Sequence, residues 1–451
     1  MMPAAFSPFL EQAPLCVMTR VTLESLLVPG RLDALFAKHA ERQYAKELLF
    51  SQVVELMLAV VLRVEPSVHA SYKKRQDQLS VSDQAIYDKL QCMETAVSAA
   101  LVADSATRLA PTIDRLKARL PSWLPGYRVR VIDGNHLGAT EKRIHALRQT
   151  WAAALPGKVL AVYDQQSDLV SDVFLTPDGH AQERTLLDDV LAIVRPRDLW
   201  IADTGFCTLK FLFTIARRKA AFVIRQHGTM VGRLIGKRRR RGRTETGQLY
   251  EQKIELTWDG QKQTFRRITL VLDKPTRNGD TEIHILTNLS QRCASAARVA
   301  ELYRNRWTIE KRFYEVTQTL DCEPNTLGYP KAALFAFCLA LLASNAVALM
   351  KASLRAVHGN EEVEKLSHFY MTLEVRQNYH GMLIALPPRS WTRFAELSAC
   401  ALAKVLRQVA RYVQPNRYRK ATRGPKKPPP KKATYQNGGH VSTHRLLEAQ
   451  K

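Results

Sequence analysis

The sequence lacks the marks of a secreted or metal-stapled protein. Its seven cysteines are scattered, odd in number and never spaced as a CxxC pair. That pattern argues against a zinc site and against a disulfide framework. The first residues contain no charged stretch followed by a long apolar core, so a secretory signal is not expected. These absences together predict a protein that works in a reducing compartment.

Long apolar runs are also scarce. Only the run at 332–350 approaches the length of a membrane span, and Ser344 and Asn345 interrupt it. We therefore expect a buried core helix there and no membrane partner. The chain has 451 residues, of which 46% are hydrophobic and 24% charged. This composition is that of a globular protein with room for several domains.

Acidic residues are in deficit. The chain has 67 Lys and Arg against 42 Asp and Glu, which gives a formal net charge of +25. Such an excess favours a polyanionic partner, with nucleic acid ahead of an acidic membrane surface. We interpret KRRRRGR at 237–243 as a basic loop that could track a DNA backbone, be disordered, or do both. The basic tail from Gln414 is expected to be disordered and attracted to phosphates.

Hydrophobic spacing divides the chain into helical and α/β parts. The first 120 or so residues have helical spacing, and PSWLPGY at 121–127 marks a boundary. Alternating apolar segments then predict strands and helices of a mixed sheet, with further strands after Gly228. The predicted segments are a helical N-terminal DNA-binding domain at 1–126, an α/β core at 127–228, an antiparallel β insertion at 229–282, the second part of the core at 283–358, C-terminal helices at 359–413 and a basic tail at 414–451.

Three carboxylates stand out in the predicted core. Asp133 and Asp203 each end an apolar strand and are followed within two residues by Gly, at the edge where α/β sheets bind ligands. Taken singly, such an Asp-Gly is far more often a turn. With Glu310, however, the set can hold two divalent ions roughly 3.5–4 Å apart, an arrangement suited to phosphodiester chemistry. Mg²⁺, with Mn²⁺ as a substitute, suits oxygen ligands of this kind.

Glu310 belongs to the segment YRNRWTIEKRFYEVT at 303–317, which contains no Gly or Pro and predicts a helix. Tyr303, Arg306 and Glu310 would lie within about 60° of one another around the helix axis. A carboxylate beside a guanidinium is often only a surface ion pair. The two upstream Asp residues are what favour a functional interpretation.

With these motifs the chain resembles the DDE transposases of bacterial insertion sequences, specifically the insertion-sequence-4 family. VIDGNHL is similar to that family's first-Asp motif, IADTGF to its second, and YRNRWTIE to the start of its Y-x2-R-x3-E-x6-K signature. The resemblance covers about 127–350. It implies an RNase H-like catalytic domain with a β insertion, in which Asp133, Asp203 and Glu310 are the catalytic and metal-binding residues.

The resemblance also implies cut-and-paste transposition through DNA hairpin ends. The expected partners are double-stranded DNA, as terminal inverted repeats and as target, and a second copy of the chain in a synaptic homodimer. The expected location is the bacterial cytoplasm, on the nucleoid. The residues expected to bind DNA are Tyr303, Arg306, Trp307, Arg238, Arg239, Arg240 and Arg241.

The chain departs from the signature at one point. The signature Lys falls at Thr317, and a nearby family Lys falls at Tyr314. A second hypothesis therefore stays open, a DNA-binding relative with impaired catalysis, although the three intact carboxylates oppose it. HALR at 145–148 suggests a tyrosine recombinase, but no suitably placed nucleophilic Tyr accompanies it.

Two further features are weaker. Trp258 in the β insertion could stack on a flipped base, which is worth roughly 1–3 kcal/mol, but a structural role in a strand is the more common one. Asp164, Asp168 and Asp172 lie close together in number. Strand alternation predicts that they face solvent.

Overall fold

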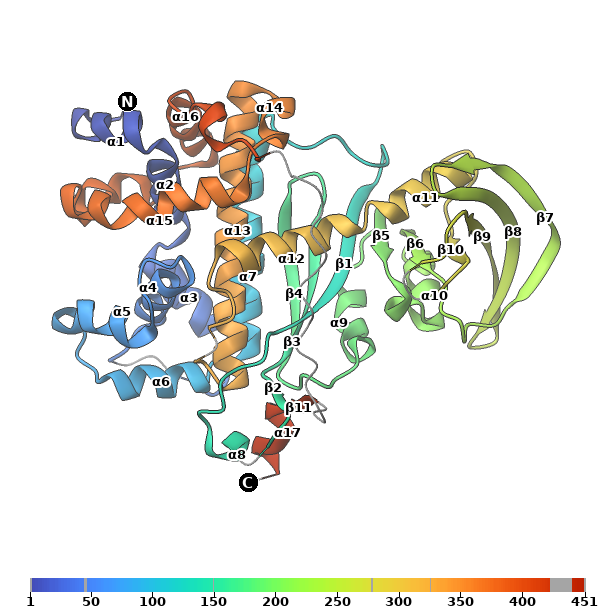
Figure 1. The fold of residues 1–451 in the computed structure, drawn as a ribbon, viewed down its shortest axis with the longest axis horizontal. Helices are drawn as coiled ribbons and strands as arrows, with labels where there is room; N and C mark the ends of the chain where they lie inside the picture. The colour runs from blue at the N-terminus through green and yellow to red at the C-terminus, as the bar shows by residue number, and fades with distance from the viewer. Residues whose placement is uncertain are drawn as a thin grey trace.

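A nine-stranded mixed sheet runs across the molecule (Figure 1). The structure is a computed structural model that describes residues 2–43, 47–148, 150–276, 279–324, 326–421 and 440–449. The strand order is β4-β3-β1-β5-β6-β10-β9-β8-β7, in which β1, β5 and β6 are parallel and the other neighbours antiparallel. The strands are β1 Arg128–His136, β3 Lys158–Asp164, β4 Leu169–Thr176, β5 Asp198–Ala202, β6 Ala221–Arg225, β7 Arg233–Thr244, β8 Gly247–Trp258, β9 Gln261–Leu272 and β10 Glu282–Thr287.

The central strands are buried on both faces, which is why their sequences are almost continuously apolar. Val131 and Ile201 face an apolar cluster shared with α7 (Thr95–Leu116) and α13 (Pro330–His358). Their neighbours Ile132 and Trp200 face a second cluster, shared with short helices on the other side of the sheet. Those short helices are α9 Leu187–Ala192 and α10 Leu209–Arg217.

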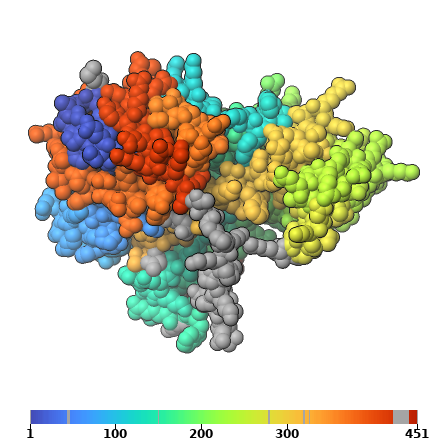
Figure 2. Space-filling model, turned by 45° about the horizontal axis from the view of Figure 1, so that its top comes forward, coloured from blue at the N-terminus to red at the C-terminus, as the bar shows by residue number. Residues whose placement is uncertain are grey.

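The N-terminal part is helical, as predicted, and it packs against the C-terminal helices. Figure 2 shows the blue N-terminal helices in one lobe with the orange and red C-terminal ones. Both sets share the apolar cluster around α7 and α13. The domain boundaries proposed at 126 and 413 therefore stay predictions. The remaining helices of this lobe are α1 Ser7–Gln12, α2 Pro14–Leu26, α3 Pro29–His39, α4 Phe50–Val61, α5 Val68–Arg75, α6 Asp83–Gln91, α14 Asn360–Glu364, α15 His368–Ala385 and α16 Ala399–Ala410.

α13 contains the long apolar run, and it is a core helix, as predicted. It is long and apolar enough to cross a membrane, but 94% of its most apolar window is buried inside the protein. The presence of Asn345 in this apolar run is explained by its hydrogen bonds. Its side chain accepts a hydrogen bond from Val170 N at 2.8 Å and donates to Val170 O and to Ser105 Oγ, each at 2.9 Å. The amide thus satisfies the free backbone edge of β4 inside the core.

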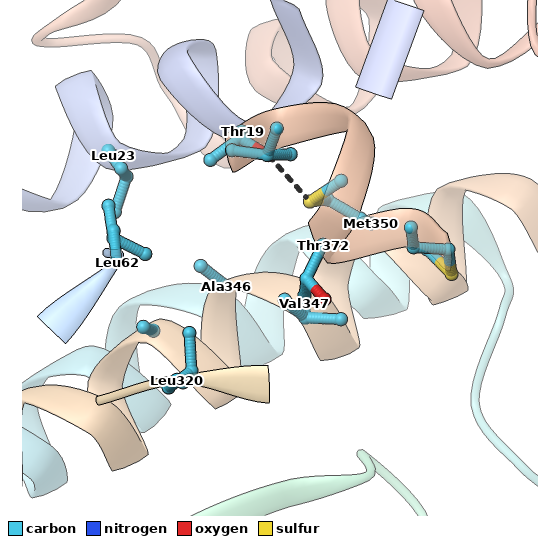
Figure 3. Close-up of a pocket in the computed structure, with 11 residues that line it drawn as sticks. Thr19, Leu23, Leu62, Leu320, Ala346, Val347, Met350 and Thr372 are labelled. Carbon is cyan, nitrogen blue, oxygen red and sulfur yellow. Dashed lines mark hydrogen bonds between the residues drawn. The ribbon is translucent and has the colours of Figure 1, made fainter. Parts of the chain in front are cut away.

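A small apolar cavity lies within the helical lobe, between α2, α13 and α15 (Figure 3). Its volume is about 30 Å³. Thr19 lines it, but its hydroxyl already donates to Leu15 O at 2.8 Å and contacts Met350 Sδ at 3.3 Å. The cavity therefore offers no unsatisfied polar group of Thr19 to a ligand, and we regard it as a packing feature.

The prediction of a basic loop at 237–243 is wrong, because these residues belong to β7. β7 pairs with β8, and β8 with β9, which pairs with β10 of the central sheet. The β insertion thus extends the main sheet at the right of Figure 1. Backbone pairing with β8 holds the arginines in an extended conformation. A run of like charges in the sequence does not by itself predict such a strand.

The prediction of one unbroken helix over 303–317 is also wrong. α11 covers Ala296–Arg304 and α12 covers Trp307–Thr319, with a turn at Asn305 and Arg306. There the backbone bonds shorten to the i→i+3 type, as in Arg306 N to Tyr303 O at 3.0 Å. Despite the break, Arg306 stays beside both residues predicted to share its face: its Nη2 donates to Glu310 at 2.7 Å, and its guanidinium lies 6.0 Å from the Tyr303 ring centroid.

The basic tail is partly ordered, contrary to the prediction. β11 (His440–Ser442) pairs in parallel with β2 (Ala153–Leu155), and α17 (Thr443–Glu448) packs near α8 (His145–Arg148) at the bottom of Figure 1. The stretch RGPKKPPPKK lies outside the described residues.

Candidate active site

Two adjacent parallel strands bring Asp133 and Asp203 to the same edge of the sheet. β1 and β5 are paired as far as Val131 and Ile201, and both Asp residues lie just beyond that pairing. Asp203 follows β5 and caps a short 3₁₀ turn, in which its Oδ1 accepts a hydrogen bond from Gly205 N at 2.8 Å. The sequence motif therefore places this carboxylate through a local capping bond.

Asp133 does not end its strand, contrary to the prediction. β1 continues to His136 because β3 pairs with it along its whole second half, Asp133 opposite Ala161. Gly134 is thus a strand residue and not part of a turn. Its N–H donates to Asp133 Oδ1 at 3.0 Å.

Glu310 reaches the site on α12, which crosses β1. The guanidinium of Arg306 bridges two of the three carboxylates. Its Nη1 donates to Asp133 Oδ2 at 2.8 Å and its Nη2 to Glu310 Oε1 at 2.7 Å. Arg306 is buried, whereas the Glu310 side chain is 45% exposed. The positive charge of Arg306 therefore links Glu310 of α12 to Asp133 of β1.

The carboxylates also affect one another. The pKa of Asp133 is raised to about 7, because burial and the charges of Asp203 and Glu310 together outweigh the opposing charge of Arg306. Burial is the largest cause of the shift, and repulsion from the two neighbouring carboxylates adds to it. In this acidic cluster Asp133 is buried, whereas the Glu310 side chain is exposed to solvent.

The donor chemistry fits a hard divalent cation, but the side chains need to rearrange to hold one. Among the described residues, no three acidic, His or Cys side chains are close enough to bind a single ion as they stand. Arg306 occupies the space between Asp133 and Glu310. Carboxylate oxygens are nevertheless the ligands that Mg²⁺ and Mn²⁺ prefer. Movement of the Arg306 side chain would free one oxygen of each acid.

Residues 124–346 match the family described as the transposase DDE domain. This part of the chain is similar to transposase DDE domains. Asp133, Asp203 and Glu310 all lie inside the matched range, as does the Arg306 bridge. A comparison with curated proteins finds no match. Among solved structures, a piggyBac transposase synaptic complex with hairpin DNA aligns over 86% of each chain at 10% identity and a TM-score of 0.39, a likeness too weak to support an inference.

Tyr303 and Trp307 line a cavity of about 480 Å³ between α11 and the extended sheet. Trp307 is 62% exposed. Tyr303 is partly buried, and burial raises the pKa of its hydroxyl. The Arg306 guanidinium lies 6.0 Å from the Tyr303 ring centroid. Of the three predicted DNA-binding residues of this segment, Arg306 contacts the acids directly, whereas Tyr303 and Trp307 line the neighbouring cavity.

The four predicted DNA-binding arginines of β7 are not equivalent. Arg238 donates to Glu282 at 3.1 Å and lies over the Tyr250 ring, while Arg241 donates to Glu251 at 3.0 Å. Arg239 and Arg240 are exposed and have no acidic partner in the described part of the chain. Only these two are free to contact a DNA backbone without breaking an ion pair.

Trp258 packs inside the domain, which supports the structural interpretation. Its ring centroid lies 5.8 Å from that of Phe213 on α10, and the Arg217 guanidinium lies 4.9 Å from the Trp258 centroid. Thr317, in place of the signature Lys, donates to Tyr314 O at 3.0 Å within α12. It supplies no positive charge to the site.

Sequence reasoning missed one acid beside the DDE motifs. Glu183 begins a 3₁₀ turn (Glu183–Leu186) and places its carboxylate next to Gly134 and Gly205. Burial raises its pKa, and the charge of Asp203 raises it further. The sequence held one hint of this neighbour, the glycines Gly134 and Gly205 that follow the motif aspartates. Only the folded chain shows that they leave space for the Glu183 carboxylate.

Sequence reasoning also misplaced Asp168, which is buried and not solvated. It accepts hydrogen bonds from Tyr163 Oη, at 2.6 Å, and from Arg312 on α12, and Arg355 on α13 lies 3.9 Å away. Asp164 is buried as well. Alternation failed because Asp168 lies in the β3–β4 turn at a φ of +63°, where the chain leaves the strand pattern. The ion pair between Asp168 and Arg312 ties α12, the helix of Glu310, to the sheet.

Proposed function

We propose that the chain is a metal-dependent DNA transposase acting on the terminal inverted repeats of an insertion sequence. The strongest support is that Asp133, Asp203 and Glu310, chosen from sequence motifs, lie at one sheet edge within the DDE-domain match. We assign an RNase H-like core to β4, β3, β1, β5 and β6, three antiparallel strands followed by two parallel ones. This order agrees with the resemblance to the insertion-sequence-4 family.

In the proposed reaction, water attacks a phosphodiester bond at the element end and releases a 3′ hydroxyl. That hydroxyl attacks the opposite strand to form a hairpin, and after the hairpin opens it attacks target DNA. Asp133, Asp203 and Glu310 would hold Mg²⁺, or Mn²⁺, which supplies Lewis acidity to the attacking and leaving oxygens. Arg306 and Tyr303 would turn to the DNA phosphate beside the cleaved bond, because a guanidinium binds phosphate in a bidentate manner.

The proposal extends to partners and location. Two element ends have to be held together, so we propose a homodimer in the synaptic complex. The excess of positive charge supports binding of double-stranded DNA along the exposed arginines of β7. We propose the nucleoid of a bacterial cytoplasm as the place of action.

The test is cleavage of DNA that carries the ends of the element, in Mg²⁺ or Mn²⁺. We expect nicks and hairpins with the wild type and none with Asp203→Asn. Asp188→Asn is the matched control, because this exposed carboxylate pairs with Lys210 outside the cluster and its loss changes the net charge equally. Absence of cleavage by the wild type on true end sequences would contradict the enzyme proposal.

A DNA-binding relative with impaired catalysis is the second candidate. Thr317 in place of the signature Lys supports it, as does the position of Arg306 between two of the acids. This candidate predicts specific binding of the end DNA with no metal-dependent products. The same cleavage assay, run beside a binding assay, separates the two.

A further inference from the structure

We propose that Glu183 is a fourth carboxylate of the catalytic site and binds a divalent cation together with Asp203. The inference rests on the proposed function, because it assumes that the acids at this sheet edge bind metal. It adds a residue from a different segment of the chain, the 3₁₀ turn between β4 and α9.

The position of Glu183 is defined by the two glycines that follow the motif aspartates. A Cβ on Gly134 would stand 2.1 Å from Glu183 Oε1. A Cβ on Gly205 would stand 3.2 Å from Glu183 Oε2 and 3.2 Å from Asp203 Oδ1. The carboxylates of Glu183 and Asp203 therefore approach the same point above Gly205, and Glu183 also covers the residue after Asp133.

Neither glycine is needed for its backbone conformation. Gly134 and Gly205 are not among the glycines with a positive φ, and Gly134 is an ordinary strand residue. A side chain at Gly134 would instead collide with the Glu183 carboxylate. The absence of a side chain at this motif position is thus explained by the space that Glu183 occupies.

The segment that carries Glu183 is held on both sides. Before it, the buried Lys158 of β3 donates from Nζ to Ala181 O at 2.7 Å. After it, Arg184 Nε donates to Gly205 O at 3.3 Å, in the loop that follows Asp203. The carboxylate is therefore directed to the acidic cluster by its neighbours and does not reach it as a free surface side chain.

Glu183 is partly buried, which raises its pKa, and the charge of Asp203 raises it further while the charge of Lys158 lowers it. No side chain in the described ranges donates a hydrogen bond to it or forms an ion pair with it within 4.0 Å. Partly buried carboxylates normally acquire such a partner, because an unpaired charge loses solvation. A divalent cation shared with Asp203 satisfies both groups. Oxygen ligands from several segments are the usual way in which proteins hold such ions.

The test is Mn²⁺ affinity of the full-length protein without DNA, measured by electron paramagnetic resonance of the free ion. Glu183→Gln keeps the shape and removes the charge, and we expect at least about tenfold weaker binding, as for other changes close to a metal. Asp203→Asn is the reference for loss of the site. Asp188→Asn, an exposed acid of α9 with the same change of charge, should bind within about twofold of the wild type.

Gly134→Ala gives a second, independent variant, because it displaces Glu183 without removing any carboxylate. We expect it to weaken Mn²⁺ binding in the wild-type background and to add nothing in a Glu183→Ala background, where the clash is gone. Thermal unfolding without metal reports whether each variant folds. Where one variant fails to fold, the other still decides the outcome.

The outcomes separate the inference from the function on which it rests. If Asp203→Asn loses Mn²⁺ while Glu183→Gln binds like the wild type, Glu183 is not a ligand and the metal site stands. Equal losses in Glu183→Gln and Asp188→Asn would reduce the effect to general electrostatics and overturn the inference. A wild type that binds no Mn²⁺ would overturn both the proposed metal site and the role of Glu183.

Discussion

Replacement of Asp168 by Asn should destabilise the protein strongly at neutral pH, because Asp168 joins α12 to the sheet through a buried charge. The carboxylate accepts bonds from Tyr163 and Arg312, and Arg355 lies nearby. Asn keeps the shape but leaves two buried guanidinium groups without their anion. The ion pair therefore matters less for its own attraction than for what remains when one partner is removed.

Two estimates give the expected loss in the free energy of unfolding. Arg312 and the other neighbouring cations outweigh burial and lower the pKa of Asp168 from 3.8 to about 2. At 1.36 kcal/mol per pKa unit, this difference is worth about 2 kcal/mol at pH 7. Breaking a buried pair by removing one partner costs about 3–5 kcal/mol. We therefore expect Asp168→Asn to lower the free energy of unfolding by about 2–4 kcal/mol.

The assay is urea unfolding followed by far-UV circular dichroism at pH 7 and pH 3. Because the folded pKa lies below the unfolded one, the carboxylate stabilises the protein fully above about pH 4, and this contribution disappears as the pH falls toward 2. The charge contribution at pH 3 should be roughly half of that at pH 7. The double variant Arg312→Met with Asp168→Asn should be more stable than Asp168→Asn alone. A loss below about 1 kcal/mol at pH 7, or one that grows as the pH falls, would refute the reasoning.

Two more predictions concern the core and the basic strand. Asn345→Leu should lower the free energy of unfolding by about 2–4 kcal/mol, because Val170 N and O lose their partners in the core. Ser105→Ala is its control in thermal unfolding, since it removes only the bond from Asn345 to Ser105 and leaves both bonds to Val170; equal losses in the two variants would contradict the account. Arg239→Gln with Arg240→Gln should reduce the slope of log affinity for DNA against log salt by about 0.9 per lost phosphate contact. Arg238→Gln, whose guanidinium is already paired with Glu282, should change that slope less, and an equal change would show that the pairing is irrelevant.

The sequence by itself determined the chemistry of the site and most of its elements. Local pattern sufficed for the strands of Asp133 and Asp203, because a short apolar run followed by Asp and Gly is typical of a buried strand. It also sufficed for α13, whose apolar length and single polar break mark a core helix. These features depend on neighbours along the chain, and neighbours along the chain are what a sequence displays.

Only the tertiary structure decided how distant segments combine. β7 is a strand and not a loop because β8 offers it partners, and Asp133 lies within a strand because β3 pairs beyond it. The bridge from Arg306 to Asp133 and the approach of Glu183 to Gly134 join residues far apart in number. Such contacts are fixed by packing and by charge balance in a buried space, and periodicity along one segment carries no information about either. Asp168 shows the same limit, since its burial depends on the arginines of two helices that arrive much later in the chain.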